Sequence, residues 1–270
     1  MSSMMESTLT AEQHALLAKV LVAQTESLGR VETPVVEDLL NRHRPKRVLD
    51  IGCGEASFLL RLARRMQATE FVGIDHSRRA VDDAVERVRR EGLSNVRLEV
   101  GFFDPSFAEA TYDAVMTRYT LQHSSQPQAF VDAAFARLRP GGGFVALESL
   151  DALTDSHEAD PVWDRFRTAL TAVHRHVGSN QDIGKSLGAL LRNAGFREIQ
   201  VRVVLCSPST VGWEPFSAVV RASAALASTF FPELFDVALR DDLDAWLDDR
   251  ALLQRKDPYL CSAIANGTRP

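Results

Sequence analysis

Apolar and polar positions recur with two periods along the chain, and together they predict an α/β protein. Short apolar runs that end at an acidic residue or a turn are typical of buried strands. Five such runs come first, at residues 48–50, 71–75, 96–100, 114–116 and 144–147. Segments with apolar residues three and four apart lie between them and predict helices. Strands that alternate with helices predict a parallel sheet flanked by helices.

The two ends of the chain predict further elements. Residues 10–13, Thr-Ala-Glu-Gln, have the form of a capping box, so a helix is expected to begin there and to run to Leu28. A second helix is expected from Pro34 to Asn41, because proline is favoured in a first helical turn. Further along, a helix is predicted at 181–194 and a strand at 198–205.

The stretch Val48–Phe58 combines a strand end, a glycine turn and a helix start. Asp50 closes the apolar run, and Gly52 and Gly54 follow at alternate positions. Glycine reaches φ values that other residues avoid, and without a Cβ the backbone can approach a ligand closely. The turn therefore predicts a loop against which the adenosine end of a cofactor lies.

The charge of this loop indicates which cofactor it binds. Glycine loops for dinucleotides hold a pyrophosphate at a helix N-terminus, and a carboxylate in the same turn repels that anion. Asp50 and Glu55 flank the loop, so a cationic ligand fits better. S-adenosylmethionine carries a sulfonium and an ammonium group and no phosphate. At this point the chain resembles class I S-adenosylmethionine-dependent methyltransferases, whose first motif is D-x-G-x-G-x-G, with Ala56 in place of the third glycine.

Asp75 ends the second predicted strand, about 25 residues after Asp50, close to the spacing at which a strand-end carboxylate reaches ribose hydroxyls. The alternative is that Asp75 caps the following helix, a role that Ser77 can take instead. The resemblance implies the ribose role. The residues expected to bind the cofactor are Asp50, Gly52, Cys53, Gly54, Asp75, His76, Phe103, Asp104 and Arg118.

The loop after the third predicted strand has the sequence Gly-Phe-Phe-Asp-Pro, residues 101–105. In the resembled family this loop holds the adenine, often with an acidic residue on the exocyclic amine and an apolar side chain against the ring. Phe102, Phe103 and Asp104 are the candidate contacts, and Phe102 occupies the place of the family's usual acidic residue. The alternative is that one phenylalanine belongs to the core and that Asp104 begins a turn.

Residues 121–143, from Leu-Gln-His to Leu-Arg-Pro-Gly-Gly-Gly, are typical of small-molecule methyltransferases of this class. His123 lies at the rim where the methyl group is expected, and imidazole titrates near neutrality, so it is the first candidate for a general base. The alternative is that His123 caps or packs the following helix. Glu148, after the fifth strand, is the second catalytic candidate. The expected acceptor-binding residues are Tyr119, Gln122, Asp151, Trp213 and Phe216.

The predicted fold is an α/β, Rossmann-like class I methyltransferase fold. The resemblance implies a seven-stranded, mostly parallel sheet with an antiparallel last strand. Residues 1–45 are predicted as N-terminal helices over the cofactor, and 46–206 with 258–270 as the core that binds S-adenosylmethionine. Residues 207–257 separate the last two strands, whereas a hairpin needs only a few residues. This aromatic segment is predicted to form a helical cap over the acceptor.

Composition limits the classes of partner. The net charge of −5 and the lack of a long basic run argue against nucleic acid, whose binding depends on neutralising phosphates. No apolar run approaches the ~20 residues of a membrane span. Three cysteines without metal-ligand spacing predict no metal site and fit a reducing cytoplasm. The oligomeric state is open, with a homodimer through the cap or the N-terminal helices as one option.

These features predict an enzyme that transfers the methyl group of S-adenosylmethionine to a small molecule, with S-adenosylhomocysteine as the second product. An aromatic or polycyclic secondary metabolite, and thus a role in natural-product biosynthesis, fits the aromatic cap best. Two alternatives stay open. One is an NAD-dependent oxidoreductase, against which Asp50 argues. The other is a protein that binds S-adenosylmethionine and catalyses a non-methylating reaction such as a cyclisation.

Overall fold

The computed structural model describes residues 10–103 and 111–270 of the chain. These residues form two compact units, each built from three stretches of chain. The core unit comprises residues within 33–149, 182–203 and 263–270, and the helical unit comprises residues up to 32, 150–181 and 204–262. One helix and two strands therefore contribute residues to both units.

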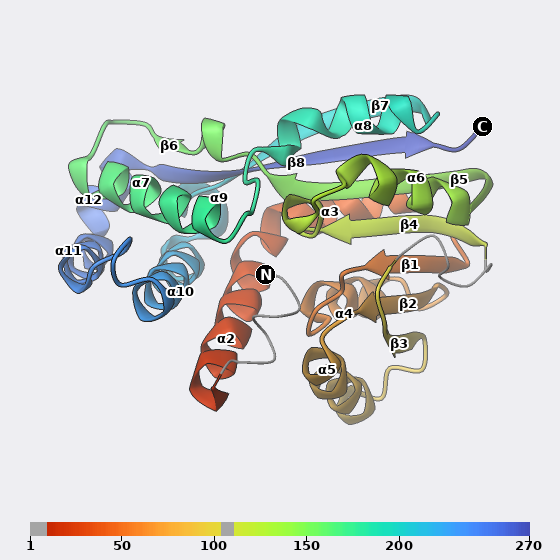
Figure 1. Cartoon of the computed structure of the whole chain (residues 1–270), viewed down its shortest axis with the longest axis horizontal. Coiled ribbons are helices and arrows are strands. Elements are labelled where there is room, and N and C mark those ends of the chain that lie inside the picture. The colour runs from red at the N-terminus through yellow and green to blue at the C-terminus, as the bar shows by residue number, and fades with distance from the viewer. Residues whose placement is uncertain (1–9, 104–110) are drawn as a thin grey trace. The chain divides into compact units, whose positions relative to one another are not determined.

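A mixed sheet forms the centre of the core unit (Figure 1). Its strands are β1 (Arg47–Ile51), β2 (Glu70–Asp75), β3 (Val96–Val100), β4 (Tyr112–Arg118), β5 (Leu138–Ser149), β7 (Arg197–Cys206) and β8 (Pro258–Thr268). The order is β3-β2-β1-β4-β5-β8-β6, where β6 is the short strand Asp155–Ser156, and β7 also pairs with β8. Among the described residues the sheet thus has eight strands, one more than the predicted seven. The pairings among β1 to β5 are parallel.

The last strand runs against β5. The Gly141 N–H donates to Arg269 O (2.8 Å), whereas Leu150 N–H, at the other end of β5, donates to Cys261 O (3.0 Å). Residue numbers thus rise on one strand as they fall on the other, which is the antiparallel arrangement. The predicted mostly parallel sheet with an antiparallel last strand is confirmed.

Helices flank this sheet, as the alternating pattern predicts. They are α3 (Gly29–Asn41), α4 (Ser57–Arg65), α5 (Arg78–Glu91), α6 (Pro127–Arg137) and α8 (Leu187–Asn193), with 3₁₀ turns η1 (Leu121–His123) and η3 (Ile183–Ser186). Two predicted boundaries were wrong. Helix α3 begins at Gly29 and carries Pro34 inside it, since Leu28 already has helical dihedral angles. The helix predicted at 181–194 is split into η3 and α8.

The helical unit is built around aromatic side chains. Its elements are α2 (Ala11–Ser27), η2 (Asp151–Leu153), β6 (Asp155–Ser156), α7 (Pro161–His176), α9 (Pro208–Val211), α10 (Trp213–Phe230), α11 (Val237–Asp248) and α12 (Arg250–Lys256). Trp163 on α7 is fully buried, and its ring stacks on those of Phe166 (5.1 Å) and Trp246 (5.7 Å). The predicted capping box is present at Thr10 and Gln13.

The grouping of segments differs from the predicted domains. Residues 150–181, predicted as core, cluster with 204–262, and residues 33–41 of α3 cluster with the core. The reason is packing, because the apolar face of α7 is buried against the aromatic residues of α10 and α11. Among the described residues, no helix combines the length and the apolar character needed to cross a membrane.

Candidate functional site

The turn between β1 and α4 has the glycine conformations that its sequence predicts. Gly52 has a φ of 75° and Gly54 a φ of 55°. The Gly52 and Cys53 N–H groups both donate to Ile74 O on β2, at 2.8 and 3.1 Å. A Cβ on Gly52 would lie 2.3 Å from Thr120 Oγ1, so the loop after β4 leaves no room for a side chain there. Both φ and space therefore require glycine at position 52.

Ala56 stands where the resembled motif has its third glycine, and it keeps a glycine-like backbone. Its φ is 59°, in the left-handed region, and its side chain is buried directly before α4. An L-residue in this region costs about 1–2 kcal/mol. The backbone of the turn thus keeps a glycine-like φ at position 56, and the alanine there carries this conformational cost.

Asp50, in β1, is the buried carboxylate directly before this turn. Its side chain is 3% exposed, and among the described residues its Oδ1 has no hydrogen-bond partner. Burial raises the pKa of Asp50 to about 7, the charge of Arg118 lowers it and the charge of Asp75 adds to the rise. A buried acceptor without a donor is costly. A cationic ligand group at this position would remove that cost.

Glu55, the other acidic residue of the turn, is already paired. Its carboxylate lies 2.8 Å from Arg87 Nη1 and accepts a hydrogen bond from Ser57 Oγ (2.5 Å). Its negative charge is thus balanced by α5. Of the two carboxylates, Asp50 is the one with a fully buried oxygen that has no hydrogen-bond partner among the described residues.

Asp75, at the end of β2, is tied to the glycine turn. Its Oδ2 accepts from Gly54 N–H (2.8 Å) and its Oδ1 accepts from Ser77 N–H (2.9 Å). The N-cap of α5 is Ser77, whose Oγ accepts from Ala80 N–H. Oδ1 also lies 3.3 Å from His76 Nδ1. A carboxylate oxygen has two acceptor positions, so Oδ2 can still accept a hydroxyl.

Aromatic rings gather where β2 and β3 end. The His76 ring stacks on Phe102 at 5.5 Å, and Phe102 is 64% exposed. Phe103 lies 5.4 Å from the ring of Phe130 on α6. The exposed flat surface thus belongs to Phe102 rather than to the predicted Phe103. Asp104 lies outside the described residues.

Cys53 is a packing residue of the turn. A Cβ on Gly73 of β2 would lie 2.9 Å from its Sγ, so the thiol fills the space beside that strand. Burial raises the pKa of Cys53 well above its usual value, and the charge of Asp50 adds to this. The side chain is therefore a neutral thiol at physiological pH.

The loop after β4 brings several predicted residues together in the core unit. The Arg118 guanidinium lies 4.7 Å from the ring centre of Phe58 and 4.6 Å from that of Tyr119. Tyr119 has a φ of 54°, rare for a non-glycine residue. In η1, Gln122 is buried and its Nε2 lies 3.3 Å from Nε2 of the exposed His123.

Glu148, near the end of β5, contacts the backbone of this loop. The carboxylate is 0% exposed and accepts from the N–H groups of Thr120 (3.1 Å), Leu121 (2.8 Å) and Gln122 (3.2 Å). Burial raises the pKa of Glu148 to about 8, while these hydrogen bonds oppose the rise. Glu148, which the sequence predicts as a catalytic carboxylate, thus accepts hydrogen bonds from the backbone of this loop.

Three predicted acceptor residues belong to the helical unit. Asp151 begins η2, and its N–H donates to Gln181 O. The Trp213 ring is half-buried, donates from Nε1 to Leu247 O (2.9 Å) and lies 4.2 Å from the Arg250 guanidinium. Phe216 is fully buried, 5.9 Å from Trp163. Its predicted role in binding the acceptor is thus corrected, because its ring packs the interior of this unit.

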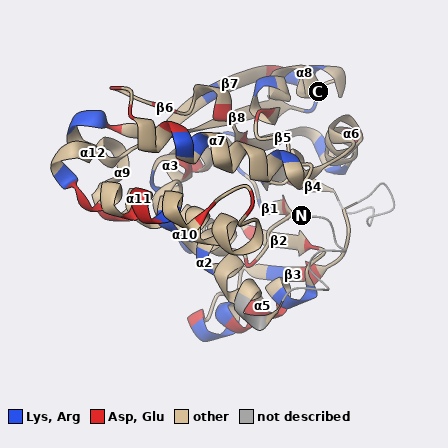
Figure 2. Cartoon of the chain, turned by 60° about the vertical axis from the view of Figure 1, so that its left-hand side comes forward, with Lys and Arg blue, Asp and Glu red and all other residues tan. Residues whose placement is uncertain are grey.

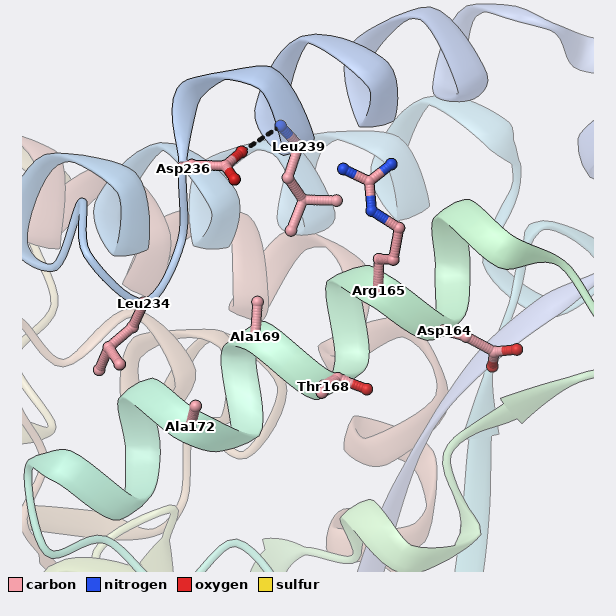
Figure 3. A pocket seen from close by; sticks show the side chains of 8 residues that line it. All are labelled: Asp164, Arg165, Thr168, Ala169, Ala172, Leu234, Asp236 and Leu239. Carbon is pink, nitrogen blue, oxygen red and sulfur yellow. Dashed lines mark hydrogen bonds between the residues drawn. The ribbon is translucent and has the colours of Figure 1, made fainter.

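A cavity of about 410 Å³ opens on the helical unit beside α7 (Figure 3). Its lining residues are Asp164, Arg165, Thr168, Ala169, Ala172, Leu234, Asp236 and Leu239. Asp236 Oδ1 accepts from Leu239 N–H (2.6 Å), and Arg165 pairs with Asp242 (2.8 Å). No aromatic residue lines this cavity, so it is not the aromatic acceptor pocket that the sequence predicts. Within the described part of the chain, no three His, Cys, Asp or Glu side chains are grouped to hold a metal ion.

The sequence does not single out Thr120. Its Oγ1 donates to Ile51 O (3.3 Å) and touches the glycine turn. The signal for it is the strand order, because β1 and β4 pair directly and their carboxyl ends must meet. Phe102 is among the candidates that the sequence offers, but the sequence does not give its exposure relative to that of Phe103.

The family now follows from comparison with known proteins. Residues 42–194 match the family model described as a methyltransferase domain. This match covers more than half of the chain, and the chain belongs to this family of methyltransferase domains.

Individual relatives share about a quarter to a third of the aligned residues with this chain. A 37.1 kDa protein of a Streptomyces fradiae transposon is 31% identical over 175 residues, 64% of this chain and 49% of that protein. An uncharacterised methyltransferase of Schizosaccharomyces pombe is 25% identical over 174 residues, 62% of each chain. This chain therefore spans only about half to three fifths of these relatives' lengths.

A solved structure shares the fold. It is a phosphoethanolamine N-methyltransferase of Haemonchus contortus, in complex with phosphomonomethylethanolamine and S-adenosylhomocysteine. The TM-score is 0.55 at 18% identity, over 86% of this chain and 52% of that one. The similarity supports the predicted Rossmann-like methyltransferase architecture.

Proposed function

We propose that this protein transfers the methyl group of S-adenosylmethionine to a small-molecule acceptor. The observation that carries the proposal is the buried Asp50 oxygen that has no partner among the described residues, beside a glycine turn without room for side chains. A cation with an adenosine moiety satisfies that oxygen, whereas a pyrophosphate would be repelled by it. Membership of the methyltransferase domain family supports the same ligand.

The residues of the core unit fit this cofactor. Asp75 would hold the ribose hydroxyls, with Oδ2 keeping an acceptor position beside the Gly54 N–H. The flat surface of Phe102 and His76 would hold the adenine. Asp50 would balance the positive charge, and the Gly52 turn would let the ligand lie against the backbone.

The chemistry that the bound cofactor supplies is a methyl group on a sulfonium, whose leaving group is a neutral thioether that needs no acid. The chain's task is then to orient the acceptor in line with that bond and to exclude water. His123, exposed at the end of η1, would accept the proton of a hydroxyl or carbon acceptor at its imidazole. Tyr119 and Gln122 would orient the acceptor. A neutral amine acceptor would need no base.

The distribution of charged side chains on the protein supports a proposal for the class of acceptor. Acidic and basic side chains are interspersed along α5 and do not form a purely basic face (Figure 2). This distribution favours a small molecule over nucleic acid. An aromatic or polycyclic secondary metabolite is the proposed acceptor, with Trp213 and Asp151 kept as proposed contacts. A cytoplasmic location and a homodimer remain predictions of the sequence.

Affinity for S-adenosylhomocysteine is expected to rise with pH through about 7. A cationic group beside Asp50 favours the ionised carboxylate, so binding below its pKa of about 7 must release a proton. The affinity should therefore be about tenfold lower at pH 6 than at pH 8. Calorimetric titrations at both pH values test this, with Asp50→Asn as the control that should remove the difference. An equal affinity of the wild type at both values would contradict the role of Asp50.

The proposed function is tested by titrating S-adenosylhomocysteine into the wild type and Asp75→Ala. We expect binding that weakens by about 100-fold in the variant, since one hydrogen bond to a charged carboxylate is worth about 1.5–3 kcal/mol. Asp82→Ala, at an exposed position of α5, is the matched control and should bind normally. Binding of NAD in place of S-adenosylhomocysteine would refute the proposal. Turnover of an acceptor without release of S-adenosylhomocysteine would point to the non-methylating alternative.

A further inference from the structure

The loop that follows β4 has a strained backbone at one residue, and the backbone N–H groups of the next three residues are bound by one side chain. Tyr119 has a φ of 54°, and such a backbone persists only where its surroundings determine it. The 3₁₀ turn that follows has no side-chain cap from its own N-cap residue, Thr120. Glu148, from the neighbouring strand β5, accepts the three N–H groups instead. One carboxylate thus holds the shape of the loop.

The same loop is attached to the glycine turn. Thr120 Oγ1 donates to Ile51 O (3.3 Å), and its side chain occupies the space that a Cβ on Gly52 would need. Thr120 N–H donates to Glu148 in turn (3.1 Å). A chain of contacts therefore runs from Glu148 through Thr120 to the cofactor side of the core unit.

Both oxygens of Glu148 bind the backbone of this loop. Oε1 accepts two N–H groups and Oε2 accepts the third. The side chain is fully buried, whereas a general base must come within hydrogen-bond reach of the proton that it removes. The hydrogen bonds of Glu148 thus hold the backbone of the loop in place.

We propose that Glu148 is a positioning residue that fixes Tyr119, Gln122 and His123 relative to the glycine turn, and that it transfers no proton. This inference rests on the proposed function, because it assigns the loop to the acceptor side of that site. Its consequence is a coupling in which a ligand on the glycine turn steadies residues 120–122 through Thr120.

Hydrogen exchange of single amides, measured by NMR on the whole chain with S-adenosylhomocysteine as the probe, tests the inference. In the wild type the ligand should slow exchange at residues 52–54 and also at 120–122. In Glu148→Gln an amide nitrogen replaces one acceptor oxygen, so the Gln122 N–H should exchange at least tenfold faster. The ligand should then still protect 52–54 but no longer 120–122. Glu86→Gln, on the exposed face of α5, is the matched control and should behave as the wild type.

The outcomes separate the two proposals. No ligand protection anywhere in the wild type would refute the proposed function. Protection at 52–54 together with unchanged exchange at 120–122 in Glu148→Gln would overturn the positioning role. A uniform rise of exchange across β1 and β4 would indicate a purely structural residue. If Glu148→Gln does not fold, Thr120→Val and Thr120→Ser replace it, and only the serine variant should keep the coupling.

Discussion

Gly52→Ala is expected to abolish measurable binding of S-adenosylhomocysteine and to destabilise the core unit by about 2–4 kcal/mol. Two costs combine at this position. The φ of 75° is unfavourable for alanine, and the new Cβ would meet Thr120 Oγ1 at 2.3 Å and Thr120 Cγ2 at 2.6 Å. The Thr120 backbone N–H is bound to Glu148, and the side chain cannot rotate aside without breaking the hydrogen bond from its Oγ1 to Ile51 O (3.3 Å). The turn itself must therefore shift, and with it the ligand site.

Urea denaturation and calorimetric titration together measure both effects. Gly92→Ala is the matched control, because Gly92 has a similar φ of 66° but nothing within 4 Å of its would-be Cβ. This control should lose only the conformational part, about 1–2 kcal/mol, and should bind the ligand normally. Wild-type affinity in Gly52→Ala would mean that the turn does not face the ligand.

Phe216→Ala should lower the free energy of unfolding by about 3–5 kcal/mol. Its ring is 0% exposed and lies 5.9 Å from that of Trp163, so truncation leaves a cavity in the aromatic interior of the helical unit. Residues that only touch an acceptor would not show such a loss. The expected result thus separates a packing role from the acceptor role that sequence analysis assigns to Phe216.

Denaturation followed by tryptophan fluorescence is the suitable measurement, since Trp163 and Trp246 both lie in this interior. Phe230→Ala provides the comparison, because Phe230 lies at the end of the same helix, is only half-buried and should cost clearly less. A Phe216→Ala variant as stable as the wild type would return this residue to the list of acceptor contacts.

The strands and the turn chemistry of the core unit could be predicted because their signals are local. An apolar run such as 71–75 must be buried on both faces, and an acidic residue at its end marks the edge of the sheet. Gly52 and Gly54 predict positive φ directly, and the structure has it at both. Thr10 and Gln13 likewise contain their whole capping motif within four residues.

The role of Glu148 and the boundaries of the two units could not be predicted in the same way. The partners of Glu148 are backbone N–H groups almost thirty residues earlier, and backbone groups carry no sequence signature. The periodicity of α7 shows that one face is apolar, but it does not say which helix covers that face. The sequence therefore predicts Phe216 as an acceptor contact, although its ring packs against Trp163 of α7.

The division of β8 has a consequence for how the chain folds during synthesis. Residues up to 262 belong to the helical unit and residues from 263 belong to the core unit. Both units thus share strand β8, and β5 lacks its antiparallel neighbour until residues 258–268 have been synthesised. Until then its outer edge exposes unpaired backbone groups, which is the kind of surface that chaperones protect. Completion of both units therefore depends on the same strand.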